Sequence, residues 1–67
     1  MKDRAKKFLL MHYKMYYEYL EEYPQQRELH SMKKYKIQGA LDIILELDIL
    51  TLSEIDSIRE QAKKEVG

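Results

Sequence analysis

The only proline of the chain, Pro24, is the residue that most constrains its fold. The preceding stretch from Asp3 to Tyr23 contains no glycine or proline and has twelve apolar or aromatic residues. It therefore predicts a helix of about 30 Å over residues 3–23. The ring of a proline clashes with the preceding helical turn, so this helix must end before Pro24 and a second helix can start after it. The sequence thus predicts a helical hairpin.

The second helix is predicted over residues 25–48, where apolar residues recur at the spacing of one buried face. These residues are Ile37, Ala40, Leu41, Ile44 and Leu47, with Ile43 and Leu45 beside them. Gly39 and Ala40 are expected to mark a close approach to the first helix. Because Ser31 could cap a later start, the pattern leaves open whether this helix is continuous through His30 and Ser31.

A third helix is predicted over residues 52–65. Thr51 and Glu54 have the spacing of a capping box, in which the first and fourth residues cap the start of a helix reciprocally. Residues 48–50 leave room only for a tight turn. The predicted inner face consists of Leu52, Ile55, Ile58, Arg59 and Ala62. No useful stretch alternates with the period of a strand, so the expected fold is all-α: one domain over residues 1–67, built as an antiparallel hairpin with a shorter third helix on it.

Size and cysteine content exclude several classes of protein. A chain of 67 residues buries a small core, and without cysteine it has neither disulfides nor a thiolate metal site to reinforce that core. The apolar run from Phe8 to Met11 is too short for the core of a signal peptide, and no run approaches the length of a membrane span. We therefore expect a cytoplasmic protein that has no membrane segment.

The pattern of chemically reactive residues does not favour catalysis. His12 and His30 lie on different predicted helices, no glycine-rich phosphate loop is present, and no serine or threonine has a convincing histidine partner. We expect no enzymatic activity, no cofactor and no metal. His12 is expected to be packed, or placed at an interface, with a hydrogen bond to a neighbour.

The net charge of zero conceals two halves of opposite charge. Residues 1–36 carry nine lysines and arginines against five acidic residues, and residues 37–67 carry three against seven. A basic segment with one aromatic residue has the composition that contacts phosphates: Arg27, Lys33, Lys34, Tyr35 and Lys36. A nucleic-acid-binding dimer is therefore one hypothesis. A solvated face that pairs with acidic residues is the favoured alternative, since the third helix begins with acidic residues that phosphates would repel.

Five of the six tyrosines lie between Tyr13 and Tyr23. At 100° per residue, the apolar residues of the first helix cover an arc of about 160°, which Tyr17 and Leu10 extend to about 220°, more than one packed neighbour needs. Tyrosine is typical of interfaces, although these tyrosines could equally line a thin core. The predicted protein interface is Leu10, Tyr13, Tyr16, Tyr17 and Leu20.

The functional hypothesis is a small protein-binding regulator, adaptor or inhibitor, of the kind that phages and other mobile elements encode. Its partner is another protein, and the chain is also expected to self-associate as a dimer through the first helix. The alternative hypothesis remains the dimeric regulator that binds nucleic acid through residues 27–36.

Overall fold

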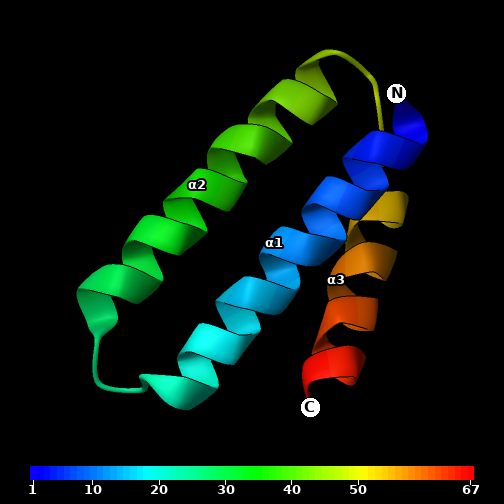
Figure 1. Cartoon of the computed structure of the whole chain (residues 1–67). Coiled ribbons are helices and arrows are strands. Elements are labelled where there is room, and N and C mark those ends of the chain that lie inside the picture. The colour runs from blue at the N-terminus through cyan, green and yellow to red at the C-terminus, as the bar shows by residue number, and fades with distance from the viewer.

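The computed structural model describes residues 1–67, which form three helices and no strand. These are α1 (Lys2–Glu22), α2 (Arg27–Glu46) and α3 (Leu52–Val66). In Figure 1, α2 runs antiparallel to α1, and α3 then runs back in the direction of α1. Helices α2 and α3 both pack against α1 and contact each other far less. The predicted all-α three-helix bundle is thus confirmed, with α1 as the helix that both others share.

The hairpin turn between α1 and α2 is closed by a histidine. Helix α1 ends at Glu22, and the backbone N–H of Tyr23 still donates to the carbonyl of Tyr19. The carbonyl of Tyr23 lies 2.6 Å from Nε2 of His30, so the imidazole donates to it across the turn. Helix α2 starts at Arg27 and is continuous through His30, which settles the question of a later start.

The turn between α2 and α3 is a Schellman motif, in which two backbone bonds close the end of a helix. The N–H of Ile49 donates to the carbonyl of Ile44 at 2.9 Å, and that of Asp48 donates to Leu45 at 3.1 Å. Asp48 has a φ of 53°, the left-handed conformation that this motif requires. The tight turn places Leu50 in the core.

The start of α3 has the capping box that the sequence predicts. The N–H of Glu54 donates to Oγ1 of Thr51 at 3.2 Å, and the N–H of Thr51 donates to Oε1 of Glu54 at 3.0 Å. The second carboxylate oxygen lies 2.9 Å from Nζ of Lys2 and 3.4 Å from Nζ of Lys6. The hydrogen bond from Lys2, followed by that from Thr51, lowers the pKa of Glu54 to about 2. One carboxylate therefore caps α3 and also connects it to α1.

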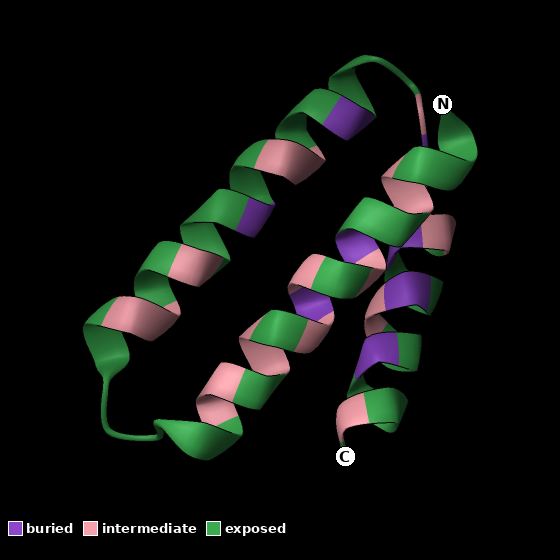
Figure 2. Ribbon diagram, viewed as in Figure 1, coloured by how far each residue is buried: buried purple, intermediate pink, exposed green.

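The core is one cluster of eight buried residues contributed by all three helices and the second turn. They are Leu9, Tyr13, Ile37, Ile44, Leu50, Ile55, Ile58 and Ala62. Figure 2 shows the buried positions on the sides of the helices that face their neighbours, with exposed residues on the outer sides. Because α1 contributes to contacts with both other helices, its core residues are the centre of the bundle.

Several predicted core positions are wrong at the helix ends. Leu47 is 63% exposed because α2 ends at Glu46 and the turn directs the chain away. Leu52 is 66% exposed because it is the first residue of α3 and precedes the buried face. The close approach predicted at Gly39 is also wrong: a Cβ there would meet nothing within 4 Å. Gly39 lies about 200° around the helix from the buried Ile37, so it faces solvent.

Candidate functional site

Three tyrosines of α1 form the floor of a groove of about 220 Å³ between α2 and α3. We call it the tyrosine groove. Its floor is Tyr13, Tyr16 and Tyr17; its walls are Lys34, Ile37, Gln38 and Leu41 of α2 and Arg59 of α3. The groove exists because α2 and α3 pack on α1 on either side of these rings without closing over them.

The tyrosine rings contact one another along the floor. The centroids of Tyr16 and Tyr17 are 5.4 Å apart with tilted planes, and those of Tyr13 and Tyr17 are 6.2 Å apart and nearly parallel. These separations are within the range of favourable aromatic pairs. A tyrosine hydroxyl is protonated at neutral pH and can donate hydrogen bonds, and burial raises the pKa values of Tyr13 and Tyr17 further. The groove therefore combines an apolar floor with hydroxyl donors.

The rim of the groove carries positive charge. Lys34 forms no ion pair within the chain, whereas Arg59 pairs with Asp56 at 2.7 Å. On the α3 side, Nζ of Lys63 lies 5.9 Å from the centre of the Tyr17 ring. An anionic group that entered the groove would meet the free ammonium of Lys34 and the guanidinium of Arg59 on opposite walls.

The five residues of the predicted protein interface are divided by the fold. Tyr13 is only 6% exposed and belongs to the core, while Leu10, Tyr16 and Tyr17 are half-buried against it. Leu20 is half-buried near the end of α1. The tyrosine groove joins the three tyrosines and leaves Leu10 on the side of a different pocket. The apolar arc of α1 is wide largely because two helices pack on it, α2 on one side and α3 on the other.

The basic segment does not form one face. Lys34 lines the tyrosine groove, whereas Lys33 lies over the ring of Tyr19, 4.2 Å from its centre. Lys36 is on the side of α2 near His12, Tyr35 is largely exposed, and Arg27 is the first residue of the helix. Lys33 and Lys36 share one side of α2, where both line a small pocket beside His12, and Lys34 is the only one of the five that lines the tyrosine groove.

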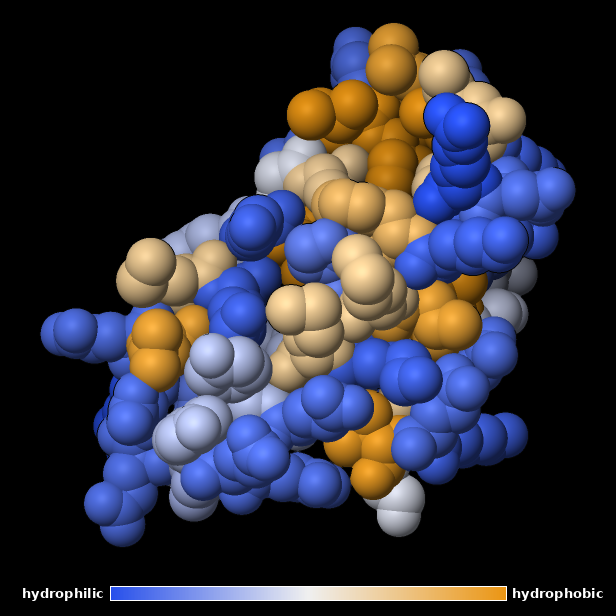
Figure 3. All heavy atoms as spheres, in the orientation of Figure 1, coloured by the Kyte–Doolittle hydropathy of each residue, from blue (hydrophilic) through white to orange (hydrophobic).

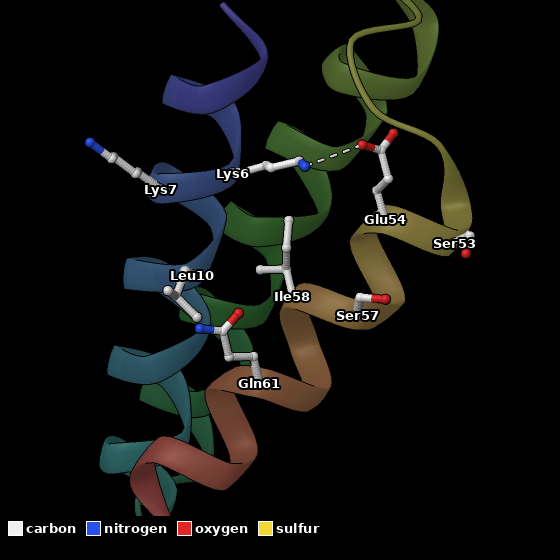
Figure 4. A pocket seen from close by; sticks show the side chains of 8 residues that line it. All are labelled: Lys6, Lys7, Leu10, Ser53, Glu54, Ser57, Ile58 and Gln61. Carbon is white, nitrogen blue, oxygen red and sulfur yellow. Dashed lines mark ion pairs between the residues drawn. The ribbon is translucent and has the colours of Figure 1, made fainter.

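A second, more polar pocket of about 380 Å³ lies between α1 and α3 (Figure 4). Lys6, Lys7 and Leu10 line it from α1, and the ion pair from Lys6 to Glu54 crosses one end. The α3 side is lined by Ser53, Glu54, Ser57, Ile58 and Gln61. The carboxylate of Glu54 caps α3 and forms two ion pairs with α1, and these contacts lower its pKa. Its role in this pocket is therefore to stabilise the fold.

His12 is half-buried with its ring 4.1 Å from that of Phe8, and it makes no hydrogen bond within the chain. The hydrogen bond expected for it is therefore absent. Burial, with smaller effects of Lys36 and Lys33, lowers the pKa of His12 and favours its neutral form.

The sequence singled out Lys34, Ile37 and Leu41 separately but did not predict that they form one wall of a groove, and it gave no role to Gln38. Gln38 and Leu41 lie four and seven residues after Lys34, so they share its side of α2, and this spacing could have identified them. Arg59 was placed on the inner face of the third helix but not next to the tyrosines, because nothing in the sequence fixes how α3 is rotated against α1.

No helix of this chain is both long and apolar enough to cross a membrane. No three histidine, aspartate or glutamate side chains are grouped to hold a metal ion. Comparison of the chain with protein-family models, curated proteins and solved structures gave no match.

Proposed function

We propose that this chain is a non-enzymatic, self-associating protein of the cytoplasm that binds a segment of another protein in its tyrosine groove. A role as a regulator, adaptor or inhibitor, of the kind that phages and other mobile elements encode, belongs to the same proposal. The observation that carries it is the groove itself, with three tyrosines on its floor and Lys34 and Arg59 on its walls.

The dimensions of the groove favour an inserted side chain. Small-molecule sites usually measure about 300–1,000 Å³, whereas the tyrosine groove measures about 220 Å³. It is suited to one or two apolar side chains of a partner, and such anchors in partly desolvated aromatic pockets supply much of the energy of protein interfaces. The tyrosine hydroxyls can satisfy polar groups beside the anchor.

The charge of the rim favours an acidic partner segment. Lys34 has no counter-ion within the chain, and Arg59 already shares one carboxylate. A carboxylate next to the apolar anchor would pair with the exposed Lys34, and the bound partner would cover this pair and weaken its screening by solvent. The proposed partner segment therefore has an apolar side chain flanked by aspartate or glutamate.

The test is affinity capture from a lysate of the producing organism, followed by titration of the captured protein with the purified chain. Lys34→Glu reverses the free charge of the groove, and Lys64→Glu is the matched control because Lys64 is exposed on α3 and does not line the groove. We expect a protein that binds the wild type and Lys64→Glu but binds Lys34→Glu at least about tenfold more weakly. Equal binding of all three chains would refute the groove as the site.

Nucleic-acid binding is the second candidate and is less favoured, because the structure divides the basic segment between several sides of α2. A gel-shift assay with DNA and RNA tests it. A shift of the nucleic acid by the chain at about 50 mM salt that disappears by about 200 mM would support this function. No shift at the lower salt would refute nucleic-acid binding.

A further inference from the structure

The solvent-facing side of α1 has six residues at alternating spacings of four and three, which we call the outer stripe. In order they are Arg4, Phe8, Met11, Met15, Glu18 and Glu22. Its three apolar members, Phe8, Met11 and Met15, have the spacing of one apolar heptad, and the charged members continue the same line toward both ends of α1. All six are exposed, and the three apolar members retain 41%, 52% and 39% of their surface. Figure 3 shows this face of the molecule, with hydrophobic atoms over the middle of α1 that continue to a larger hydrophobic area at the top of the view, and hydrophilic side chains on either side and below.

The charges at the two ends of α1 oppose the dipole of the helix. A helix N-terminus is favoured by acidic residues and a C-terminus by basic ones. Here the first two turns are mostly basic, and the last turn contains acidic residues and no basic residue. Several of these charged residues form no ion pair within the chain: Arg4, Lys7, Glu18, Glu21 and Glu22. These end charges are unfavourable for α1 in a single chain. The basic start of α1 and its acidic end carry opposite charges, so the start of one α1 is complementary to the end of another.

We propose that a second copy of this chain packs its α1 antiparallel against the outer stripe. With the twofold axis near residue 13, Met11 of one copy lies opposite Met15 of the other, and Arg4 lies opposite Glu22. Lys7 then flanks Glu21 of the second copy. Every one of these contacts occurs twice, as in any interface with twofold symmetry. A parallel pair would instead place Arg4 against Arg4 and Glu22 against Glu22.

This inference rests on the self-association included in the proposed function and names the surface that carries it out. The tyrosine face of α1 cannot serve, because Tyr13 is in the core and helices α2 and α3 flank the groove. Every residue of the outer stripe is exposed, although Met15 also borders α2, where it lines a small pocket with Lys33 and Lys36. A shallow hollow of about 360 Å³ runs along it beside Met11, Lys14 and Met15. The register also predicts unfavourable contacts: Phe8 of one copy lies opposite Glu18 of the other, and Lys14 lies near the proposed axis, where it would face its own copy.

The experiment measures the dimer dissociation constant by sedimentation equilibrium for the wild type and charge-reversed variants. Arg4→Glu and Glu22→Arg should each weaken the dimer about tenfold, because each replaces two attractive pairs with two repulsive ones. The double variant Arg4→Glu/Glu22→Arg restores complementarity and should recover wild-type association. Lys14→Met should strengthen the dimer, and Lys64→Glu on α3 is the control that should leave it unchanged.

A direct check on folding comes from the same variants. Each single reversal removes a charge that opposes the helix dipole, so the monomer should unfold at an equal or higher temperature while its association weakens. Loss of association together with loss of helix content would refute this account, as would single reversals that the double variant does not rescue. A dimer that is insensitive to both reversals would overturn the outer stripe but leave self-association standing. A wild type that stays monomeric would refute both the outer stripe and self-association. Binding in the tyrosine groove is tested separately by Lys34→Glu.

Discussion

Replacement of Leu9 by alanine should be among the most damaging truncations in this chain. Leu9 is the one large side chain that is completely buried, and it lies on α1, the helix against which both others pack. The change removes three carbon atoms, equivalent to about 2.4 kcal/mol of transfer free energy at about 0.8 kcal/mol each. The cavity that remains raises the expected loss to about 2–5 kcal/mol.

That loss is large against the total stability of so small a domain. At about 0.05–0.15 kcal/mol per residue, the whole fold is stable by only about 3–10 kcal/mol. A loss of 2.4 kcal/mol corresponds to a fall in melting temperature of about 10–20 °C for a domain of this size. We therefore expect Leu9→Ala to leave a chain that is partly unfolded at moderate temperature.

The assay is urea unfolding followed by far-ultraviolet circular dichroism, with all variants at one chain concentration because self-association would contribute to stability. Leu52→Ala is the matched control, since it removes the same atoms from a side chain that is 66% exposed. It should change the free energy of unfolding by less than about 0.5 kcal/mol. If the two variants lose similar free energy, then Leu9 is not the centre of the core and the packing described above is wrong.

Four further predictions concern the helix ends and the exposed glycine. Gly39→Ala should stabilise the chain by about 1 kcal/mol, because the added methyl meets nothing and alanine is the better helix former; a loss in urea unfolding would contradict the open environment of this residue. Asp48→Gly should stabilise it by on the order of 0.5 kcal/mol, because glycine adopts the left-handed conformation more easily, and Asp48→Ala should do the opposite. Thr51→Ala should cost about 1 kcal/mol while Thr51→Ser costs little, since serine keeps the capping oxygen; equal losses would show that the cap is not the reason. The folded pKa of Glu54 lies below its unfolded value of 4.5, so its contribution to stability is complete above about pH 4.5 and is lost as the pH falls toward 2; Glu54→Gln should flatten that part of the stability profile, and an unchanged profile would argue against the ion pairs with α1.

The sequence was sufficient for those parts of the fold that depend on local chemistry. Pro24 and the capping box of Thr51 act within a few residues, so the number of helices and the start of α3 could be predicted from them. The burial of Leu50 could not, because it follows from the Schellman turn at Asp48, and aspartate in a left-handed conformation has no strong sequence signal.

The candidate site was predictable only in part for a different reason. The tyrosines and Lys34 could be singled out by composition, but whether a side chain is core or surface depends on how the helices are rotated against one another. Tyr13 and Tyr17 are one turn apart on α1, yet the first is in the core and the second is half-buried at the groove. That difference arises from the positions of α2 and α3, which are long-range properties of the chain.

The two proposed surfaces have a geometric relation that links self-association to partner binding. At 100° per residue, the outer stripe around Met11 and Met15 lies on the opposite side of α1 from Tyr13 and Tyr17, so a second copy on the stripe would not cover the tyrosine groove. The antiparallel dimer would therefore present two identical grooves related by a twofold axis. A partner with two acidic segments could occupy both at once, and its second contact would form at the high effective concentration that the first provides. Weakening the dimer with Arg4→Glu should then lower the apparent affinity for such a partner although Arg4 does not line the groove, whereas the affinity for an isolated segment should not change.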